Sequence, residues 1–300
     1  MTEDRVERVL EGAVDLHVHP APSPLPRRID AGEAAELAGE AGFDAIVVKS
    51  HHHSTVMDVL ALGERAGANG SAARVFGGIV LNSAVGGLNP HAVDLALKMG
   101  GRVVWFPTIG SPQHIAHHKA HPNLKFPKLD VKLQPERPVD VFGEDGKLKP
   151  EVHRILESIA DADAILASGH MSPASITAVF EAAREKGVRR MLVNHPNFVI
   201  EASYDDARHW VGLGALIEHS LCMYDEASSF YHWDLETLLK WIEAVGAEHS
   251  TLGSDLGQKA NPLPTESFRK IVNGLLDRGM PERDVRRMVA DNPRDLLGAS

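Results

Sequence analysis

The chain has 300 residues, of which 43% are hydrophobic, and it carries a formal net charge of −10. This length and apolar content suffice for a full core, and they allow either one large domain or two. The negative charge argues against nucleic acids and anionic membranes as partners, because no basic field is available to attract phosphates. A small molecule is the expected substrate.

The single cysteine, Cys222, excludes an internal disulfide and indicates a reducing compartment. The first ten residues are charged and lack the apolar core of a signal peptide. No apolar run approaches the roughly 18 residues that a membrane-spanning helix needs. We therefore expect a cytoplasmic protein, and an exposed patch on its outer helices would allow a homo-oligomer.

Eight short apolar runs recur along the chain, with helical stretches between them. The runs are continuously apolar, which is typical of buried parallel strands rather than of half-exposed ones. The predicted strands are Val14–His19, Asp44–Ser50, Arg74–Asn82, Arg102–Thr108, Ala164–His170, Met191–His195, Gly214–His219 and Ser250–Asp255.

The stretches between the strands have the pattern of amphipathic helices, and several end at glycine, a common helix stop. Strands that alternate with helices imply a parallel sheet, and eight such units fit one (β/α)8 barrel over residues 1–300. An open doubly wound sheet is the alternative, but no glycine-rich dinucleotide fingerprint follows the first strand. The clearest predicted helices are Ala31–Gly42, Val56–Gly67, Pro90–Met99, Ser172–Gly187 and Asp234–Gly246.

A long stretch between the fourth and fifth predicted strands, at about 110–151, interrupts this alternation of strands and helices. It is rich in proline, lysine and histidine and is too long for an ordinary connection. In a barrel it would be an insertion after strand four, at the mouth where active sites lie. A shorter excursion, Tyr224–Trp233, follows strand seven, and we expect both segments to shape the substrate site.

His17 and His19 stand one residue apart at the end of the first predicted strand. Alternate side chains share one face of a strand, so both imidazoles should point the same way. Two neutral nitrogen donors on one face supply half of a metal site. Taken alone, the pair fits ordinary strand-end histidines better than metal ligands, and it is the other strand ends that reverse this interpretation.

Ligand-type residues also stand at the ends of most other predicted strands. The carboxyl ends of barrel strands converge on one mouth, so these side chains should become neighbours despite their separation in sequence. They are Lys49 and His51 on and after strand two, His170 on strand five, His195 on strand six, Glu218 on strand seven and Asp255 on strand eight.

Several of these residues, in this order, make the chain resemble the amidohydrolase superfamily over essentially its whole length. The likeness rests on His17-x-His19, His170, His195, Asp255 and the closing run Asn292-Pro293-x-x-Leu296-Leu297-Gly298. It implies a distorted (β/α)8 barrel of the single-barrel type with one or two divalent metals. Two zinc ions are expected, with manganese or iron as alternatives.

The resemblance further implies a metal-dependent hydrolase in which a metal-bound hydroxide attacks an amide, ester, lactone or phosphoester. Asp255 would bind metal and shuttle the proton to the leaving group. His17 and His19 would share one metal with Asp255, whereas His170 and His195 would bind the second.

Lys49 departs from the common pattern of that superfamily. Binuclear members often carry a carboxylated lysine on strand four, but strand four here has no lysine, glutamate or aspartate. Some relatives instead place a bridging cysteine on strand two, where Lys49 lies. We expect Lys49, as its carbamate, to bridge the metals; otherwise it is an ammonium that pairs with Asp255 or Glu218 beside a single metal.

Three further residues are candidates for substrate contact. His51 follows Lys49 by two positions and should share its inward face. Glu218 would contact substrate or orient a ligand histidine, although a satisfied core carboxylate is an equal alternative. Arg28 follows the proline-rich loop after strand one and would meet an anionic substrate, and Cys222 reads as a small buried residue.

Four histidines in the insertion, His114, His117, His118 and His121, have helical spacing and would form one face. We favour a solvated face over a substrate lid or a third metal site. Three alternatives to the hydrolase remain: a single-metal decarboxylase or hydratase of the same superfamily, a non-catalytic metal-binding protein, and a phosphatase-type barrel. The phosphatase-type barrel would need more pairs of ligand residues late in the chain than the sequence contains.

Overall fold

The computed structural model describes residues 2–63, 72–123 and 131–298. All eight predicted strands are present in it, and the third is divided at Gly77 into two short strands. At Gly77 a side chain would collide with the backbone of Thr55, so the chain bends there against the start of a helix. The strands are β1 (Val14–Val18), β2 (Ala45–Val48), β3 (Arg74–Phe76), β4 (Gly78–Val80), β5 (Val103–Trp105), β6 (Ile165–Ala167), β7 (Arg190–Asn194), β8 (Ala215–Ser220) and β9 (Ser250–Gly253).

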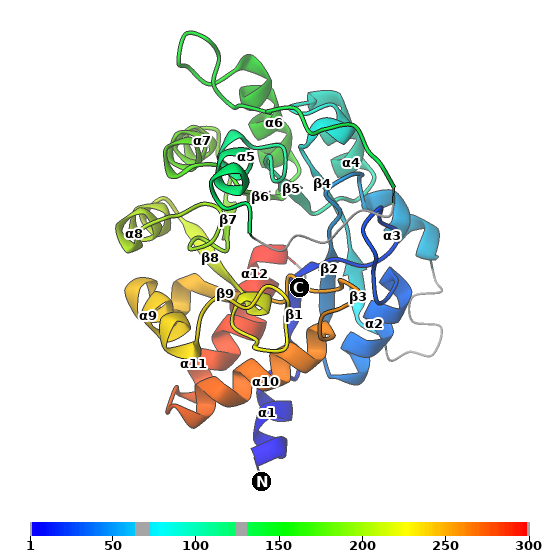
Figure 1. Ribbon diagram of the computed structural model, residues 1–300, viewed down its shortest axis with the longest axis vertical. Helices are drawn as coiled ribbons and strands as arrows, with labels where there is room; N and C mark the ends of the chain where they lie inside the picture. Colours follow the sequence, from blue (N-terminus) through cyan, green and yellow to red (C-terminus); the bar gives the residue numbers. More distant parts are fainter. Residues whose placement is uncertain (1, 64–71, 124–130, 299–300) are drawn as a thin grey trace.

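The strands form two parallel sheets, β1-β2-β3 and β4-β5-β6-β7-β8-β9, which together make the wall of a barrel. β3 and β4 follow each other directly along the chain. At the other junction, a parallel bridge joins Val18 to Leu256, and the amide of Asp255 donates to the carbonyl of His17 at 2.8 Å. The strands lie at the centre with helices around them, which confirms the predicted (β/α)8 architecture (Figure 1).

The five helices predicted most clearly are all present, although residues 64–67 of the second lie outside the described residues. Their starts follow the sequence signals: Asp30 makes a capping box with Glu33, and Ser172 accepts from the amide of Ser175. Within the described part of the chain, no helix is long and apolar enough to cross a membrane. The helices are α1 (Thr2–Leu10), α2 (Ala31–Glu40), α3 (Val56–Leu62), α4 (Pro90–Lys98), α5 (Pro112–Ala120), α6 (Pro150–Asp161), α7 (Pro173–Glu185), α8 (Tyr204–Gly212), α9 (Leu235–Val245), α10 (Pro264–Asp277), α11 (Glu282–Arg286), α12 (Asn292–Leu297) and the short turns Ser83–Val85, Leu221–Met223, Ala247–His249 and Arg287–Asp291.

The insertion after the fourth barrel strand contributes helix α5. Ser111 begins this helix by accepting from the amide of His114 at 3.0 Å, and its hydroxyl also binds the backbone carbonyl of His170. Because His170 follows β6, these bonds hold α5 against the carboxyl end of the barrel. Later in the insertion, Phe142 and Leu148 form an antiparallel bridge before α6 begins.

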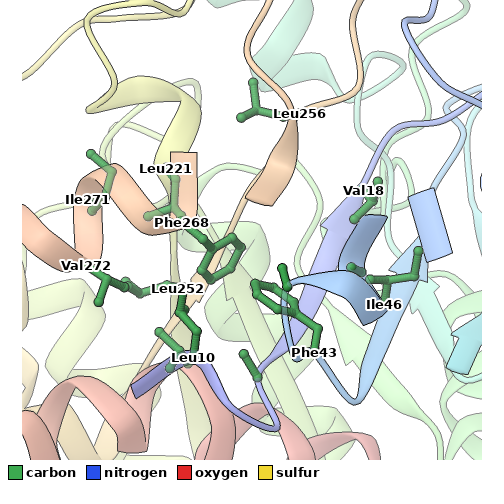
Figure 2. Packing of buried hydrophobic residues seen from close by; sticks show 14 of the residues in the cluster. Leu10, Val18, Phe43, Ile46, Leu221, Leu252, Leu256, Phe268, Ile271 and Val272 are labelled. Atoms are coloured by element: carbon green, nitrogen blue, oxygen red, sulfur yellow. The ribbon is translucent and has the colours of Figure 1, made fainter. Parts of the chain in front are cut away.

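A cluster of buried apolar side chains joins the first and last strands to the helices outside them. The rings of Phe43 and Phe268 meet edge to face at 5.1 Å, next to Leu10 and Leu252 (Figure 2). Edge-to-face aromatic pairs add stability beyond the area they bury. The cluster thereby fixes β1 against β9, the two strands whose ends carry His17, His19 and Asp255.

Candidate active site

The carboxyl ends of the strands surround a cavity that holds about 550 Å³ of empty space, counting the part open to solvent. Five histidines from four different strand ends and from α5 line it: His19, His51, His114, His170 and His195. Lys49 and Asp255 lie on the same wall, so the barrel brings the predicted ligand residues to one place.

His17, His19 and Asp255 form the tightest group of ligand-type residues in the cavity. One ligand atom from each lies within 4.8 Å of the others. Nε2 of His17 is 3.3 Å from Asp255 Oδ1, and Nε2 of His19 is 3.1 Å from the same oxygen. The predicted first-metal ligands are therefore adjacent.

Hydrogen bonds on the far side of both rings determine which nitrogen carries a proton. Nδ1 of His17 lies 2.6 Å from Glu218 Oε1, and Nδ1 of His19 lies 3.0 Å from the carbonyl oxygen of Lys49. The ionised Glu218 carboxylate and the Lys49 carbonyl can only accept, so each Nδ1 donates, and in the neutral ring Nε2 then carries the lone pair. Three acceptor atoms, two Nε2 and Asp255 Oδ1, thus converge on one point, where a cation would satisfy them all.

The charge states of these groups support that arrangement. Burial lowers the pKa of His19 to about 3, so its ring is neutral at physiological pH. Burial opposes ionisation of Asp255, but His17, His19 and His195 together hold the pKa of its carboxyl well below the usual range. The neutral imidazole of His19 and the ionised carboxyl of Asp255 are ligand forms that zinc, manganese and iron(II) require.

Glu218 is fully buried behind His17 rather than exposed in the cavity. It accepts a hydrogen bond from Asn194 Nδ2 at 3.1 Å in addition to the bond from His17. Burial raises the pKa of Glu218, yet the contacts with His17 and Asn194 outweigh burial and lower it. Of the roles that the sequence suggested for Glu218, this position fits the one in which it orients a ligand histidine.

His170 and His195 lie next to each other, with ring centroids 4.8 Å apart, and the ring of His195 is 6.2 Å from that of His17. Burial lowers the pKa of His195 to about 4, so this ring is also neutral. Its Nδ1 is buried and has no hydrogen-bond partner among the described residues. A buried polar atom without a partner is costly, which is consistent with an absent ligand at this position.

Lys49 lies between the two histidine groups and is one of the largest fully buried side chains. Its Nζ is 2.9 Å from His17 Nε2 and 5.4 Å from the centre of the Trp105 ring. Burial lowers the pKa of Lys49 to about 8, against the opposing attraction of Asp255 and Glu218. Near neutral pH, a larger fraction of Lys49 is therefore in the neutral amine form than in an ordinary lysine.

His51 lines the cavity, as the sequence predicts for a residue on the inward face of β2. Its Nδ1 lies 2.8 Å from the hydroxyl of Thr108, which also accepts a hydrogen bond from Asn82 at 2.7 Å. Asn82 donates a second bond to the carbonyl of His51. These contacts hold the ring in a fixed orientation toward the cavity.

The solvated face predicted for the insertion histidines is wrong for His114, which is only 6% exposed and lines the cavity. Its Nδ1 is 2.8 Å from Nδ1 of His170. His117 and His121 lie farther out on α5, where they form a second group of ligand-type atoms with Glu201. The spacing predicted one helix face, but the docking of α5 on the barrel depends on tertiary contacts that the spacing does not encode.

Arg28, the predicted anion contact, points away from the cavity and donates to the carbonyl of Asn261 at 3.0 Å. The preceding residue, Arg27, lines the cavity instead. The cavity also contains apolar side chains that sequence reasoning missed, including Phe198, Met223 and Phe230. They follow the ends of β7 and β8 on irregular segments, where no hydrophobic period marks which side chains point inward.

Cys222 lies in the cavity wall and is buried, as expected. Burial and the neighbouring carboxylate of Asp255 raise the pKa of its thiol well above the ordinary value. A protonated, shielded thiol is a poor nucleophile. The cysteine therefore contributes shape to the site rather than reactivity.

Residues 12–218 match a family of unknown function (DUF6282). The search of curated proteins found no match.

Solved structures with a similar fold cover almost all of this chain. An amidohydrolase and the probable dipeptidase PvdM, both from Pseudomonas aeruginosa, each align over 99% of this chain and 98% of their own with TM-scores of 0.64, at 12% and 11% identity. A 2,6-dihydroxybenzoate decarboxylase from Rhizobium aligns over 96% of this chain and 99% of its own at 11% identity and a TM-score of 0.55. At these identities the likeness establishes the amidohydrolase-type barrel fold.

Proposed function

This chain belongs to a family of unknown function (DUF6282), and we propose that it is a metal-dependent hydrolase that cleaves an amide, ester, lactone or phosphoester bond in a small molecule. One observation carries the proposal. Two histidine Nε2 lone pairs and a carboxylate oxygen converge at 3.1–3.3 Å, at the inner wall of an open cavity. Without a cation, three such acceptors repel one another, so the arrangement fits a divalent metal.

The donor set extends to two metals in this proposal. His17, His19 and Asp255 hold the first, and His170 and His195 hold the second, with zinc favoured by the nitrogen-rich set. Lys49 would bind both metals as a carbamate, formed from its neutral amine and carbon dioxide with loss of a proton, which is supported by its contact with His17, its interaction with His170 and His195, and the pKa of about 8 that its burial produces. When bound, such metals would lower the pKa of water toward ~7 and polarise a carbonyl or phosphoryl oxygen.

The chain's own residues then have distinct tasks. Asp255, whose side chain is 16% exposed toward the cavity, accepts a proton and returns it to the leaving group. Glu218 keeps Nδ1 of His17 protonated and the ring oriented. His51 and His114, on opposite sides of His170, contact the substrate, and α5 shields the site from water.

A panel of esters, lactones, amides, dipeptides and phosphoesters, assayed with zinc- and manganese-loaded protein, tests the activity. Asp255→Asn should lower turnover of any substrate found by about 10²–10⁴-fold while the circular dichroism spectrum stays unchanged. His249→Gln, at the opposite end of β9, is the control and should retain full activity. Full activity of Asp255→Asn, or tight metal binding with no turnover across the panel, would reject the hydrolase.

A single-metal decarboxylase is the second candidate, and one contact favours it. Nζ of Lys49 lies 2.9 Å from His17 Nε2, the arrangement of an ammonium that donates to a ring nitrogen. Metal analysis separates the candidates. Two equivalents per chain, with one lost in Lys49→Ala, support the bridge, whereas one equivalent in both proteins supports the single-metal enzyme.

A further inference from the structure

Arg27 reaches the cavity from the loop between β1 and α2, and the backbone on both sides of it is fixed. The amide of Arg28 donates to the carbonyl of Gly257 at 2.9 Å, and the amide of Lys259 donates to the carbonyl of Pro26 at 3.1 Å. The backbone of Arg27 also forms an isolated antiparallel β-bridge with that of Gln258. The loop is thus attached to the segment after β9, which also carries Asp255, and it places the guanidinium beside the metal ligands.

Arg27 is partly buried, and its guanidinium makes no ion pair with any residue that the structure describes. Its Nε is buried and makes no hydrogen bond to any residue that the structure describes. Its nearest negative charge is Asp255, which His17 and His19 already share. By contrast, the exposed Arg28 beside it contacts Glu266 and the carbonyl of Asn261.

This contrast between neighbouring arginines points to a ligand. An arginine at the surface costs little when it is unpaired, whereas a guanidinium that is largely shielded from water, with its Nε buried and unbonded, is unfavourable without a partner. Arg27, in the cavity wall, makes no ion pair with a described residue, whereas Arg28, at the surface, pairs with Glu266. A carboxylate is the anion that matches the planar fork of a guanidinium with two parallel hydrogen bonds.

The wall of the cavity near Arg27 shows what the rest of the ligand should be. Leu25, Phe198, Met223 and Phe230 line it together with the arginine. Such side chains favour an aliphatic or aromatic body and offer it no charged partner. A single unpaired guanidinium also balances one negative charge, as a carboxylate carries, better than the two charges of a phosphate monoester.

We propose that the substrate is a small carboxylate with an apolar body, whose carboxylate pairs with Arg27 while its reacting bond lies beside Asp255. This rests on the proposed function for the position of the reacting bond, but the binding of the carboxylate does not depend on hydrolysis. Arg27 is then the residue that selects anionic over neutral substrates of the same shape.

The test is calorimetric titration with three carboxylates, phenylacetate, hippurate and hexanoate, each against its neutral primary amide. The zinc-loaded protein should bind at least one carboxylate on the order of 10- to 100-fold more tightly than its amide. Arg27→Met should abolish that preference, Arg27→Lys should keep part of it, and Arg28→Met should leave it unchanged. Arg28→Met is the matched control because it removes the same charge one residue away.

Several outcomes would overturn the proposal. They are equal affinity for acids and amides, no binding of any of the six compounds, or a preference that persists in Arg27→Met because the metal alone holds the carboxylate. Tighter binding of phenyl phosphate than of every carboxylate, lost in Arg27→Met, would assign the site to phosphoesters instead. Titrations repeated after metal removal by a chelator separate the two proposals, because carboxylate preference without metal can survive even if the protein proves not to be a hydrolase.

Discussion

Asp15 is a buried carboxyl on β1, two residues before His17, and its replacement by asparagine should change how stability depends on pH. Its Oδ1 accepts from the amides of His17 and Ser254 at 3.0 and 2.9 Å, whereas Oδ2 has no partner among the described residues. Burial raises its pKa from 3.8 to about 6, against the hydrogen bonds from Ser254 and His17. Asparagine keeps the accepting oxygen and removes the ionisation.

The sign of the effect follows from proton linkage. Because the folded-state pKa of Asp15 lies above the unfolded-state value, the folded protein binds more protons between about pH 3.8 and 6. The stability contributed by this group is fully present below the lower value and is lost as pH rises through the upper one. From pH 8 down to pH 5 the gain is about 1.4 kcal/mol, and at still lower pH it approaches about 3 kcal/mol.

Urea unfolding of chelator-treated wild type and Asp15→Asn at pH 5, 6, 7 and 8 measures this contribution. The stability of the variant relative to wild type should fall by about 1.4 kcal/mol from pH 8 to pH 5. The buried histidines titrate in both proteins, so their contributions cancel in the difference. Asp205→Asn, at a 92% exposed side chain, controls for loss of a surface carboxylate. A pH-independent difference, or one of opposite sign, would refute the reasoning.

Three further substitutions test other parts of the structure. Glu218→Gln removes the charge that orients His17 and should weaken metal binding about 10- to 100-fold, measured by competition with a chromophoric chelator. Phe268→Ala leaves a cavity against the first and last strands and should lower the free energy of unfolding by about 3–5 kcal/mol in urea. Gly257→Ala, at a φ of +131°, drives a methyl group into the carbonyl of His19 and should lower both thermal stability and metal affinity.

Matched controls accompany these substitutions. Glu226→Gln, on the exposed surface, should leave metal affinity unchanged, and equal losses at both glutamates would exclude a specific role for Glu218. Leu95→Ala, at a 56% exposed residue, should change stability by no more than about 0.5 kcal/mol. Gly100→Ala has a similar positive φ of +96° but open space around it, so metal affinity should fall only in Gly257→Ala.

The sequence predicted that His17, His19 and Asp255 would lie together because strand ends obey simple geometry. His17 and His19 share a face through the two-residue period of a strand, and parallel strands bring Asp255 to the same end of the barrel. Neither inference needs side-chain packing. The division of the third strand at Gly77, by contrast, depends on the close approach of Thr55, which no local sequence pattern predicts.

Residues on loops were predicted less well, for a related physical reason. Arg27 and Arg28 are adjacent, and nothing in their neighbourhood has a period that assigns one of them to the inside. The backbone bonds to Gly257 and Lys259 decide which arginine faces the cavity, and they join segments more than 200 residues apart. His114 is placed in the same way, by the bonds between Ser111 and the chain after β6.

His17 connects Glu218 and Lys49 with the proposed metal site, because each of its ring nitrogens lies next to one of these two side chains. Glu218 fixes the proton on Nδ1, so Nε2 has one lone pair to offer, and Lys49 Nζ lies 2.9 Å from it. A divalent cation at that lone pair and an ammonium at Lys49 would repel each other by several kcal/mol even at an effective dielectric constant of about 20. An ammonium at Lys49, as in the single-metal candidate, would therefore weaken metal binding at His17, whereas loss of its proton, which the pKa of about 8 makes inexpensive, or formation of a carbamate would remove that repulsion. In the proposed site, the protonation state of Lys49 and the metal affinity of His17 are thus coupled.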